Sequence, residues 1–513
     1  MSSYTRLQDR DEQEHGITAS LAPSNSALIR DWVAKLRRST NGNLGDRPNY
    51  YVTHPLSLLT TSTPQNFTLG TGLSIYTSTL LPAIESATRE IILVTCFWAA
   101  SPTLSALVAS LRRLSATVLR DGRERVKVRM CFSSSSLLQK LFHTSSLRGR
   151  VWSPEEWMKL GLPREDELPG LDVSVKSMFV RPFSVMHPKF LVVDGSRVWV
   201  PSCNVSWEEW FEGCIEIKGD VVQQFTRFYD AFWESEEEKI NFDIDLPTNI
   251  HPPGSAAAWP SAPSSTFEHN PSLSPASSST PLISTTSIST LFLPSPHHSS
   301  LILSFPFLSP FLPSSLSPPP TPLNTFLLLA LSHAQKSIYI QTPNLTSPSV
   351  LSAISAALQR GVHVEILTSE RLMLLEQLVT AMTTTTRCIK QLIKTHSTQL
   401  QSTQPPPSPF ETDLEAGGGG QQQRRRTIGE LRISYYQPRP NAGPGEPVQS
   451  HLKLTVVDQE VVVLGSGNMD RASWFTSQEL GVAFFSEEMA RRVRRDVDGS
   501  LQGRKKVVYD SAE

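Results

Sequence analysis

The sequence predicts an α/β fold of two similar lobes, each a mixed β-sheet flanked by helices, related by a pseudo-two-fold axis and interrupted by disordered insertions. The first supporting observation is a pattern, His-x-Lys-x-x-x-x-Asp, that occurs at 187–194 and again at 451–458. The second is that the same order of helix-like and strand-like segments precedes each copy. A chain of 513 residues has the length of about three domain-sized units, so two lobes and several insertions fit within it.

Each lobe is predicted to begin with a helix, a strand, a second helix and a second strand. In the first lobe these segments lie at 75–88, 91–98, 103–119 and 126–132. In the second lobe they lie at 325–335, 337–342, 348–359 and 362–368, and one further strand follows in each lobe, at 171–180 and 431–437. A strand, a crossover helix and a strand favour parallel pairing, whereas the short strands at 190–194 and 197–202 favour a hairpin. Each sheet is therefore predicted to be mixed.

Composition predicts where the lobes begin and end. Ser, Pro and Thr dominate one long segment, and Pro, Gly and Gln dominate a second, so neither buries enough apolar surface to offset its ordering entropy. The resulting division has an N-terminal extension, partly disordered (1–65), a first lobe (66–245), a disordered linker (246–321), a second lobe in two parts (322–398 and 428–497) around a low-complexity insertion (399–427), and a basic tail (498–513).

Charge and composition narrow the class of protein. The net charge of −1 provides no overall excess of basic residues for a polyanion, so nucleic acid is not the favoured partner. The N-terminal residues lack the layout of a signal peptide, and no apolar run is long enough to span a bilayer. Five cysteines without C-x-x-C pairing indicate free thiols in a reducing compartment. We expect an intracellular monomer, soluble or peripheral to membranes.

The residues after each motif also repeat. Six residues separate Asp194 from the segment Pro-Ser-Cys-Asn, and six separate Asp458 from Gly-Ser-Gly-Asn. Within each motif His and Lys are two apart in a predicted strand, so their side chains share a face. Bringing the lobes together assembles two imidazoles, two ammonium groups and two amides around one cavity. The predicted catalytic residues are His187, Lys189, Asn204, His451, Lys453 and Asn468.

This set of side chains suits a phosphodiester. A neutral histidine attacks phosphorus to form a covalent phosphoenzyme, while a second, protonated histidine delivers a proton to the departing alcohol. Lysine and asparagine hold the non-bridging oxygens, where negative charge gathers during transfer. The arrangement requires no metal and no cofactor.

Four further residues have supporting roles in this hypothesis. Asp194 and Asp458 are interpreted as anchors of the strand ends that bond to backbone and lysine within their own lobe. For Ser202 and Ser466 two roles stay open, as hydrogen-bond donors to phosphate or as turn residues.

The doubled motif with its downstream Ser and Asn resembles that of the phospholipase D superfamily, over about 67–243 and 325–493. The resemblance implies a bilobal fold, a phosphohistidine intermediate and one site between the lobes. The sequence itself does not show which histidine is the nucleophile and which is the acid. The resemblance implies that His187 is the nucleophile and His451 the acid. It also implies that Glu212 and Glu479 orient the histidines, although Glu212 lies eight residues past the first Asn and Glu479 eleven past the second. Symmetry is further reduced because Pro201 stands where the second lobe has Gly465.

Two other features receive structural interpretations. Trp207, Trp210 and Phe211 lie beside Asn204 and are predicted to pack between the lobes, with the lining of a substrate mouth as the alternative. The basic runs at 491–495 and 504–506 are interpreted as a solvated helix end and tail rather than as a surface for anionic lipid or nucleic acid.

We therefore predict a phospholipase D-like phosphodiesterase or phosphatidyltransferase that acts on phospholipid at a membrane surface, with water or a primary alcohol as acceptor. Cardiolipin synthase-like transfer is one variant, since an alcohol replaces water in the second step. One alternative is a nuclease or tyrosyl-DNA phosphodiesterase-like enzyme, which would have a basic, aromatic-lined groove between the lobes. Another is a catalytically inactive lipid-binding scaffold, against which the complete His, Lys and Asn set argues.

Overall fold

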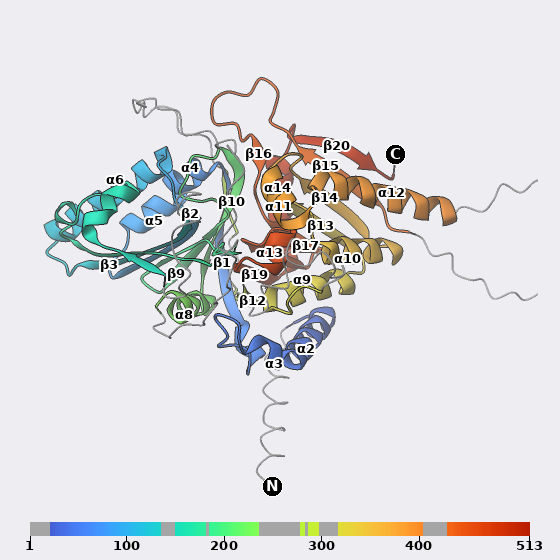
Figure 1. Cartoon of the computed structure of the whole chain (residues 1–513), viewed down its shortest axis with the longest axis horizontal. Helices are drawn as coiled ribbons and strands as arrows, with labels where there is room; N and C mark the ends of the chain where they lie inside the picture. Colours follow the sequence, from blue (N-terminus) through green and yellow to red (C-terminus); the bar gives the residue numbers. More distant parts are fainter. Residues whose placement is uncertain are drawn as a thin grey trace, which may run out of the picture.

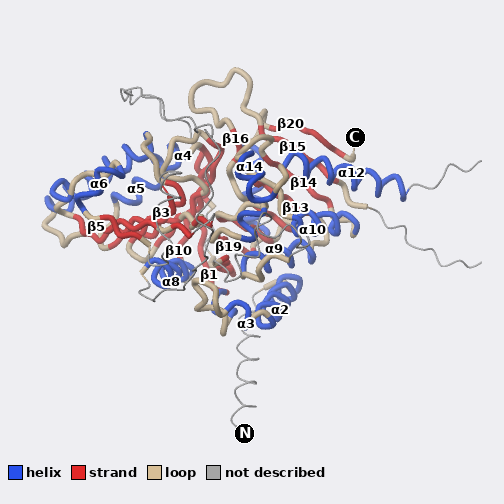
Figure 2. The backbone as a smooth tube through the Cα atoms, viewed as in Figure 1, coloured by secondary structure: helices blue, strands red, loops and turns tan. Residues whose placement is uncertain are grey.

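The computed structural model describes residues 21–134, 149–180, 184–234, 278–282, 286–296, 317–403 and 428–512. The first lobe occupies one half of the molecule and the second lobe the other, with the N-terminal helices beneath the second (Figure 1). Strands run through the middle of both halves, and helices lie around them (Figure 2). The predicted two-lobed mixed α/β fold is confirmed.

In the described residues, seven strands run side by side across the sheet of the first lobe, and two of the pairings between them are parallel. The parallel pairings join β5 to β3 and β3 to β2, and every later neighbour is antiparallel. In spatial order the strands are β5 (Leu171–Ser177), β3 (Val126–Ser134), β2 (Glu90–Phe97), β8 (Phe190–Val193), β9 (Arg197–Pro201), β10 (Trp210–Lys218) and β1 (Leu59–Gly70). A short strand, β4 (Arg150–Trp152), pairs with β5 at the outer edge.

The second lobe repeats this order and these directions. In spatial order its strands are β15 (Leu431–Tyr436), β14 (His363–Thr368), β13 (Ser337–Thr342), β17 (Leu454–Val457), β18 (Val461–Gly465), β19 (Glu479–Phe485) and β12 (Ile288–Ser295). The last strands of the two lobes, β1 and β12, pair with each other, with Leu59 opposite Leu291. The sheets of the two lobes are therefore joined by backbone hydrogen bonds.

Helices cover the sheets. The first lobe has α4 (Gly72–Ile75), α5 (Leu81–Glu85), α6 (Pro102–Arg120) and α8 (Val221–Trp233), and the second has α9 (Pro322–His333), α10 (Pro348–Gln359), α11 (Leu374–Ala381), α12 (Thr385–Thr403), α13 (Arg471–Phe475) and α14 (Glu487–Ser500). The predicted crossover helix α6 starts where the Ser101 hydroxyl accepts from the Leu104 N–H at 3.1 Å, with Pro102 in the first turn. No helix in the described ranges combines the length and the apolar character needed to cross a bilayer.

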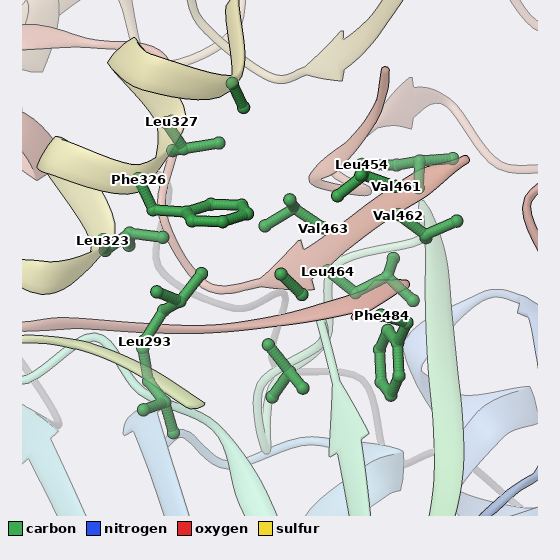
Figure 3. Close-up of a cluster of buried hydrophobic side chains, with 14 of the residues drawn as sticks. Leu293, Leu323, Phe326, Leu327, Leu454, Val461, Val462, Val463, Leu464 and Phe484 are labelled. Atoms are coloured by element: carbon green, nitrogen blue, oxygen red, sulfur yellow. The ribbon is translucent and has the colours of Figure 1, made fainter. Parts of the chain in front are cut away.

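The prediction of a disordered linker at 246–321 is wrong for the part that the structure describes. Strand β11 (Ser278–Pro281) pairs with β1, and β12 is the counterpart of β1 in the second lobe. Leu291, Phe292 and Leu293 are fully buried, and Leu293 belongs to an apolar cluster with residues of α9 and β18 (Figure 3). The apolar run of β12 is short, and the Ser and Pro residues around it dominate the composition of the segment. Residues 246–277, 283–285 and 297–316 lie outside the described residues.

The predicted boundaries at the other insertions also shift. The basic tail at 498–513 instead contains the end of α14 and strand β20 (Lys505–Asp510), which pairs antiparallel with β15. Helix α12 continues to Thr403, and the remaining residues of the predicted insertion, 404–427, lie outside the described part. In the N-terminal extension, α2 (Pro23–Arg38) and α3 (Thr40–Asn43) are ordered, and the Trp32 indole donates to the Pro322 carbonyl at 3.0 Å.

Candidate active site

Each His-x-Lys segment lies in the loop that enters a central strand. His187 and Lys189 precede β8, and His451 and Lys453 precede β17, so the prediction that these residues lie within the strands is wrong by a few residues. The reason is that the histidine backbones bond to the opposite lobe. The His187 N–H donates to the Gln478 carbonyl at 3.0 Å, and the His451 N–H donates to the Phe211 carbonyl at 2.9 Å.

The histidines and glutamates pair across the lobes. The Nδ1 atom of His187, from the first lobe, lies 2.8 Å from Oε2 of Glu479, from the second lobe. The Nδ1 atom of His451 lies 2.8 Å from Oε1 of Glu212, from the first lobe. Because an ionised carboxylate only accepts hydrogen bonds, each neutral imidazole carries its proton on Nδ1 and leaves the Nε2 lone pair available.

The two serines hold these glutamates. The Ser202 hydroxyl donates to Glu212 and accepts from the Gly213 N–H at 2.9 Å. The Ser466 hydroxyl donates to Glu479 and accepts from the Leu480 N–H at 3.0 Å. The sequence left two roles open for these serines, as hydrogen-bond donors to phosphate or as turn residues. The structure gives them a third role, because each serine positions the carboxylate that orients the histidine of the other lobe.

Burial sets the protonation state of both imidazoles. Burial lowers the pKa of His187 to about 4, against the opposing effect of Glu479, and the ammonium groups of Lys189 and Lys453 lower it further. Burial likewise lowers the pKa of His451 to about 3, against Glu212, with the same two lysines contributing. Both imidazoles are therefore neutral at pH 7. Because both ammonium groups lower the pKa of each imidazole, the two histidines and the two lysines lie in one site.

The acidic and basic groups around the imidazoles are also buried. Burial raises the pKa of Glu212 and of Glu479, but the paired histidine and serine outweigh it, so the net pKa of each carboxyl is lowered. Burial lowers the pKa of Lys453 to about 7, with Glu212 opposing. The Lys189 ammonium donates to the His187 carbonyl at 3.0 Å, and the Lys453 ammonium donates to the His451 carbonyl at 2.7 Å. Each motif lysine is thus tied to its own histidine.

The two asparagines are used differently. The Asn204 Oδ1 atom accepts from the Phe97 N–H at 3.2 Å, which leaves its amide N–H groups to donate. The Asn468 Nδ2 atom donates to Asp470 at 2.9 Å, and its buried Oδ1 has no hydrogen-bond partner among the described residues. One lobe therefore offers an amide donor, and the other an unpaired amide acceptor.

The motif aspartates lie away from the imidazoles and anchor strand ends. Asp194 accepts from the backbone N–H groups of Thr88, Arg89 and Glu90 at 2.7–3.0 Å, and Asp458 accepts from those of 335–337 at 2.7–2.9 Å. Both have φ of 53°, a left-handed conformation in which Asp is among the better tolerated residues. Asp194 also accepts from the Thr88 hydroxyl at 2.7 Å. The motif lysines bond the histidine carbonyls instead of these aspartates.

Sequence reasoning missed one contact of the site and misplaced one aromatic residue. Asp470 orients Asn468 and also caps α13 by accepting from the Ser473 N–H at 2.8 Å, and an Asp before a short helical segment was the available signal. Trp210 packs on His451, with ring centroids 4.6 Å apart, as the interpretation of packing between lobes requires. Trp207 instead is 48% exposed.

Comparisons with known proteins identify a matching domain in the second lobe and a similar fold over most of the chain. Residues 327–500 match the family model described as the phospholipase D-like domain of cardiolipin synthase. The phosphatidylserine synthase of Haemophilus influenzae Rd KW20 is similar over 87% of this chain and 89% of its own, at 14% identity and a TM-score of 0.50. The phospholipase D family member Nuc from Salmonella typhimurium is 20% identical over 36% of this chain and 91% of its own, with a TM-score of 0.24. A search of curated protein sequences found no match.

The family model covers the second motif and its downstream Ser, Asn and Glu, and the phosphatidylserine synthase fold extends over both lobes. The first lobe carries the same motif in the same strand order, and its residues complete the site of the second. The second lobe therefore carries the phospholipase D-like domain that the family model describes, and the doubled motif and the two-lobed fold extend this similarity to the first lobe.

Proposed function

We propose that the chain is a phosphodiesterase or phosphatidyltransferase that cleaves or exchanges phospholipid phosphodiesters through a phosphohistidine intermediate. The observation that carries the proposal is the pair of crossed His–Glu contacts, which hold two buried imidazoles in the tautomer that leaves Nε2 available. A nucleophile and a proton donor are the two groups that a phosphodiester exchange requires.

In the first step Nε2 of His187 attacks phosphorus, and the bond from phosphorus to the leaving alkoxide breaks. His451, protonated at Nε2, delivers its proton to that oxygen, and the ion pair with Glu212 stabilises its imidazolium form. The incoming phosphodiester is anionic, and its charge raises the pKa of His451 in the complex, opposing the burial that lowers it in the free site.

In the second step water or an alcohol attacks the phosphohistidine. His451, now neutral, accepts the proton of the attacking hydroxyl, and His187 leaves as the neutral imidazole, so the site returns to its starting state. The ammonium groups of Lys189 and Lys453 and the amide of Asn204 hold the non-bridging oxygens in both steps. With water the product is a phosphomonoester, and with an alcohol it is a new diester.

Two observations support a phospholipid substrate. The matched domain is described as that of cardiolipin synthase, and the similar fold is that of a phosphatidylserine synthase, so both are named for the synthesis of a phospholipid. The net charge of −1 also provides no general attraction for a nucleic acid backbone. We therefore favour transfer to a lipid or small alcohol, of the cardiolipin synthase type, over hydrolysis.

The experiment incubates the purified chain with labelled phosphatidylcholine, phosphatidylglycerol or single-stranded DNA, with and without a primary alcohol. We expect release of the headgroup from lipid and, with the alcohol present, formation of the corresponding phosphatidyl alcohol. H187N and H451N serve as matched controls, since Asn retains a polar amide in place of each imidazole.

Three outcomes contradict parts of this proposal. Turnover of DNA with none of lipid would identify a superfamily nuclease instead. Turnover that survives both histidine substitutions would refute the phosphohistidine mechanism. Lipid binding without turnover of any diester would identify the inactive scaffold.

A further inference from the structure

We infer that helix α11 and the start of α12 form a surface that docks on an anionic phospholipid bilayer beside the active site. The inference deepens the proposed function, on which it rests for the link between docking and turnover. Its first basis is a group of apolar side chains on α11 that face solvent. Leu374, Leu375, Leu378 and Met382, together called the α11 patch, are 38, 58, 48 and 56% exposed.

The three leucines of the α11 patch occupy one face of the helix. At 3.6 residues per turn they fall within about 100° of one another, and Met382 follows where the helix ends in a left-handed conformation. Gln377 points the other way and is buried, with its Oε1 accepting from the Thr385 N–H at 2.6 Å. An apolar face of a short helix that is held to the protein on its opposite side is the arrangement of an interfacial anchor.

Cations follow the α11 patch directly in the chain. Arg387, Lys390 and Lys394 lie on α12 at i, i+3 and i+7, so they share a face, and all three are exposed. Within the described residues no ion pair involves any of them. The basic run of α14 differs, because Arg491 and Arg492 are neutralised by Glu487 and Glu488 at 2.7 and 2.8 Å.

A groove between α10 and α12 connects the cations with the α11 patch. The groove is lined by all three cations, by Ser352 and Ser355, and by Thr383, the neighbour of Met382. Ammonium, guanidinium and hydroxyl donors are the groups that bind lipid phosphate, and the adjoining leucines match the acyl region beneath it. Charge and polarity together therefore specify an anionic bilayer rather than an apolar protein partner.

The docking surface is tied to the catalytic residues. Thr385, which holds Gln377 of α11, accepts through its Oγ1 from the Leu345 N–H at 3.0 Å. Leu345 in turn bridges to Met469, the neighbour of Asn468. Helix α11 also contacts α13, which follows that asparagine, and Figure 1 shows the two helices at the centre of the molecule. A bilayer bound here would hold lipid headgroups next to the second half of the site.

The test measures co-sedimentation of the full chain with vesicles of phosphatidylcholine alone or mixed with phosphatidylglycerol. One variant is R387E/K390E/K394E and the other is L375S/L378S/M382S, all at exposed positions. The matched controls are K127E and L119S, which change an exposed cation and an exposed leucine in the first lobe. Thermal unfolding verifies that each variant is folded.

We expect the charge variant to lose at least about tenfold in binding to the mixed vesicles, and the apolar variant to lose binding to both compositions, with both controls unchanged. Turnover of vesicle lipid should fall in parallel, while turnover of a short-chain, monomeric phospholipid stays as in the wild type. Wild-type binding by both variants would overturn the inference, as would loss of binding to single-stranded DNA rather than to vesicles. If no phospholipid is turned over but the variants still lose vesicle binding, docking stands and the proposed function fails.

Discussion

The two lobes contribute the same residues to the site but use them differently. In both, a histidine N–H bonds to the other lobe, a lysine bonds its own histidine carbonyl, and a serine holds the glutamate that orients the opposite imidazole. The asparagines depart from this symmetry, since one accepts from the backbone and the other donates to Asp470. His187 is also more accessible, with 13% of its side chain exposed against 3% for His451.

The backbone contacts and the histidine–glutamate pairs of the site are symmetric. The exposure of the histidines and the hydrogen bonds of the asparagines are not. The shared backbone bonds and crossed glutamates come from the repeated strand order, which generates the same contacts twice. The unequal exposure and the unequal asparagines suit two histidines with different tasks. The more accessible His187 suits attack on phosphorus, and the more enclosed His451 suits proton transfer.

The largest predicted effect distinguishes the two histidines. H187N should lose activity by at least about 10⁴-fold on every diester, because no nucleophile remains. H451N should lose about 10²–10⁴-fold on alkyl diesters but much less on a nitrophenyl diester, whose leaving group needs no proton. Initial rates on the two substrate types provide the measurement. Rescue of H187N by the nitrophenyl substrate, with H451N inactive, would reverse the assigned roles.

The second prediction concerns the crossed glutamates. E212Q and E479Q should each lower kcat by about 10²-fold, because the imidazole loses the partner that fixes its tautomer. Each carboxylate raises the pKa of its histidine, so removing it lowers that pKa. E212Q should therefore move the alkaline limb of the pH profile, where the acid loses its proton, to lower pH. E479Q should move the acidic limb, where the nucleophile becomes protonated, to lower pH.

Full pH profiles of kcat for the wild type and both glutamine variants provide the measurement. If E479Q moved the alkaline limb and E212Q the acidic one, the nucleophile would be His451. If neither limb moved, the glutamates would not govern these titrations.

A third, smaller effect tests the unequal asparagines. D470A should lower kcat/KM by about tenfold, because Asn468 loses the hydrogen bond at 2.9 Å that orients it. D470N keeps one amide oxygen, which accepts for the α13 cap, but its amide nitrogen then faces Asn468 and cannot accept, so D470N should lower kcat/KM about as much as D470A. Ser206, two residues past Asn204, is the matched position in the first lobe, and S206A should have no effect. Equal losses in D470A and S206A would contradict the asymmetry.

The smallest effect on activity is expected at the strand anchors. D194N and D458N retain a residue that tolerates the left-handed φ but lose the carboxylate that accepts three backbone N–H groups. Each should lower the free energy of unfolding by about 1–3 kcal/mol while kcat changes less than about threefold. Urea unfolding and initial rates of the two variants provide the measurement. A large loss of kcat without loss of stability would assign these residues to the chemistry.

The contribution of Asp194 to the free energy of unfolding depends on pH in a defined direction. Burial raises the pKa of Asp194, but the backbone and Thr88 hydrogen bonds outweigh it, so the net pKa is lowered. Its stabilising contribution is therefore present above the unfolded pKa of about 3.9 and is lost as the pH falls below that value. The difference in stability between wild type and D194N should shrink over the same range.

The order of elements was predictable because periodicity and repetition are local properties of the chain. The predicted segments at 91–98, 126–132, 337–342 and 362–368 coincide with β2, β3, β13 and β14 within two residues at each end. Strand β12 was missed because its apolar run is short and stands within a Ser- and Pro-rich context, and only its two antiparallel partners make it a strand. The terminal strand β20 was missed because its charged composition reads as a tail.

The sequence by itself determined the doubled motif, the mixed two-lobed fold and the set of candidate residues, because these depend on residue types at fixed offsets. The tertiary structure alone decided which glutamate serves which histidine, that the serines hold those glutamates, and that Asp470 orients one asparagine and not the other. The physical reason is that these are contacts between residues far apart in the chain or between side chains whose directions depend on the loops around them. Offsets along one strand do not contain that information.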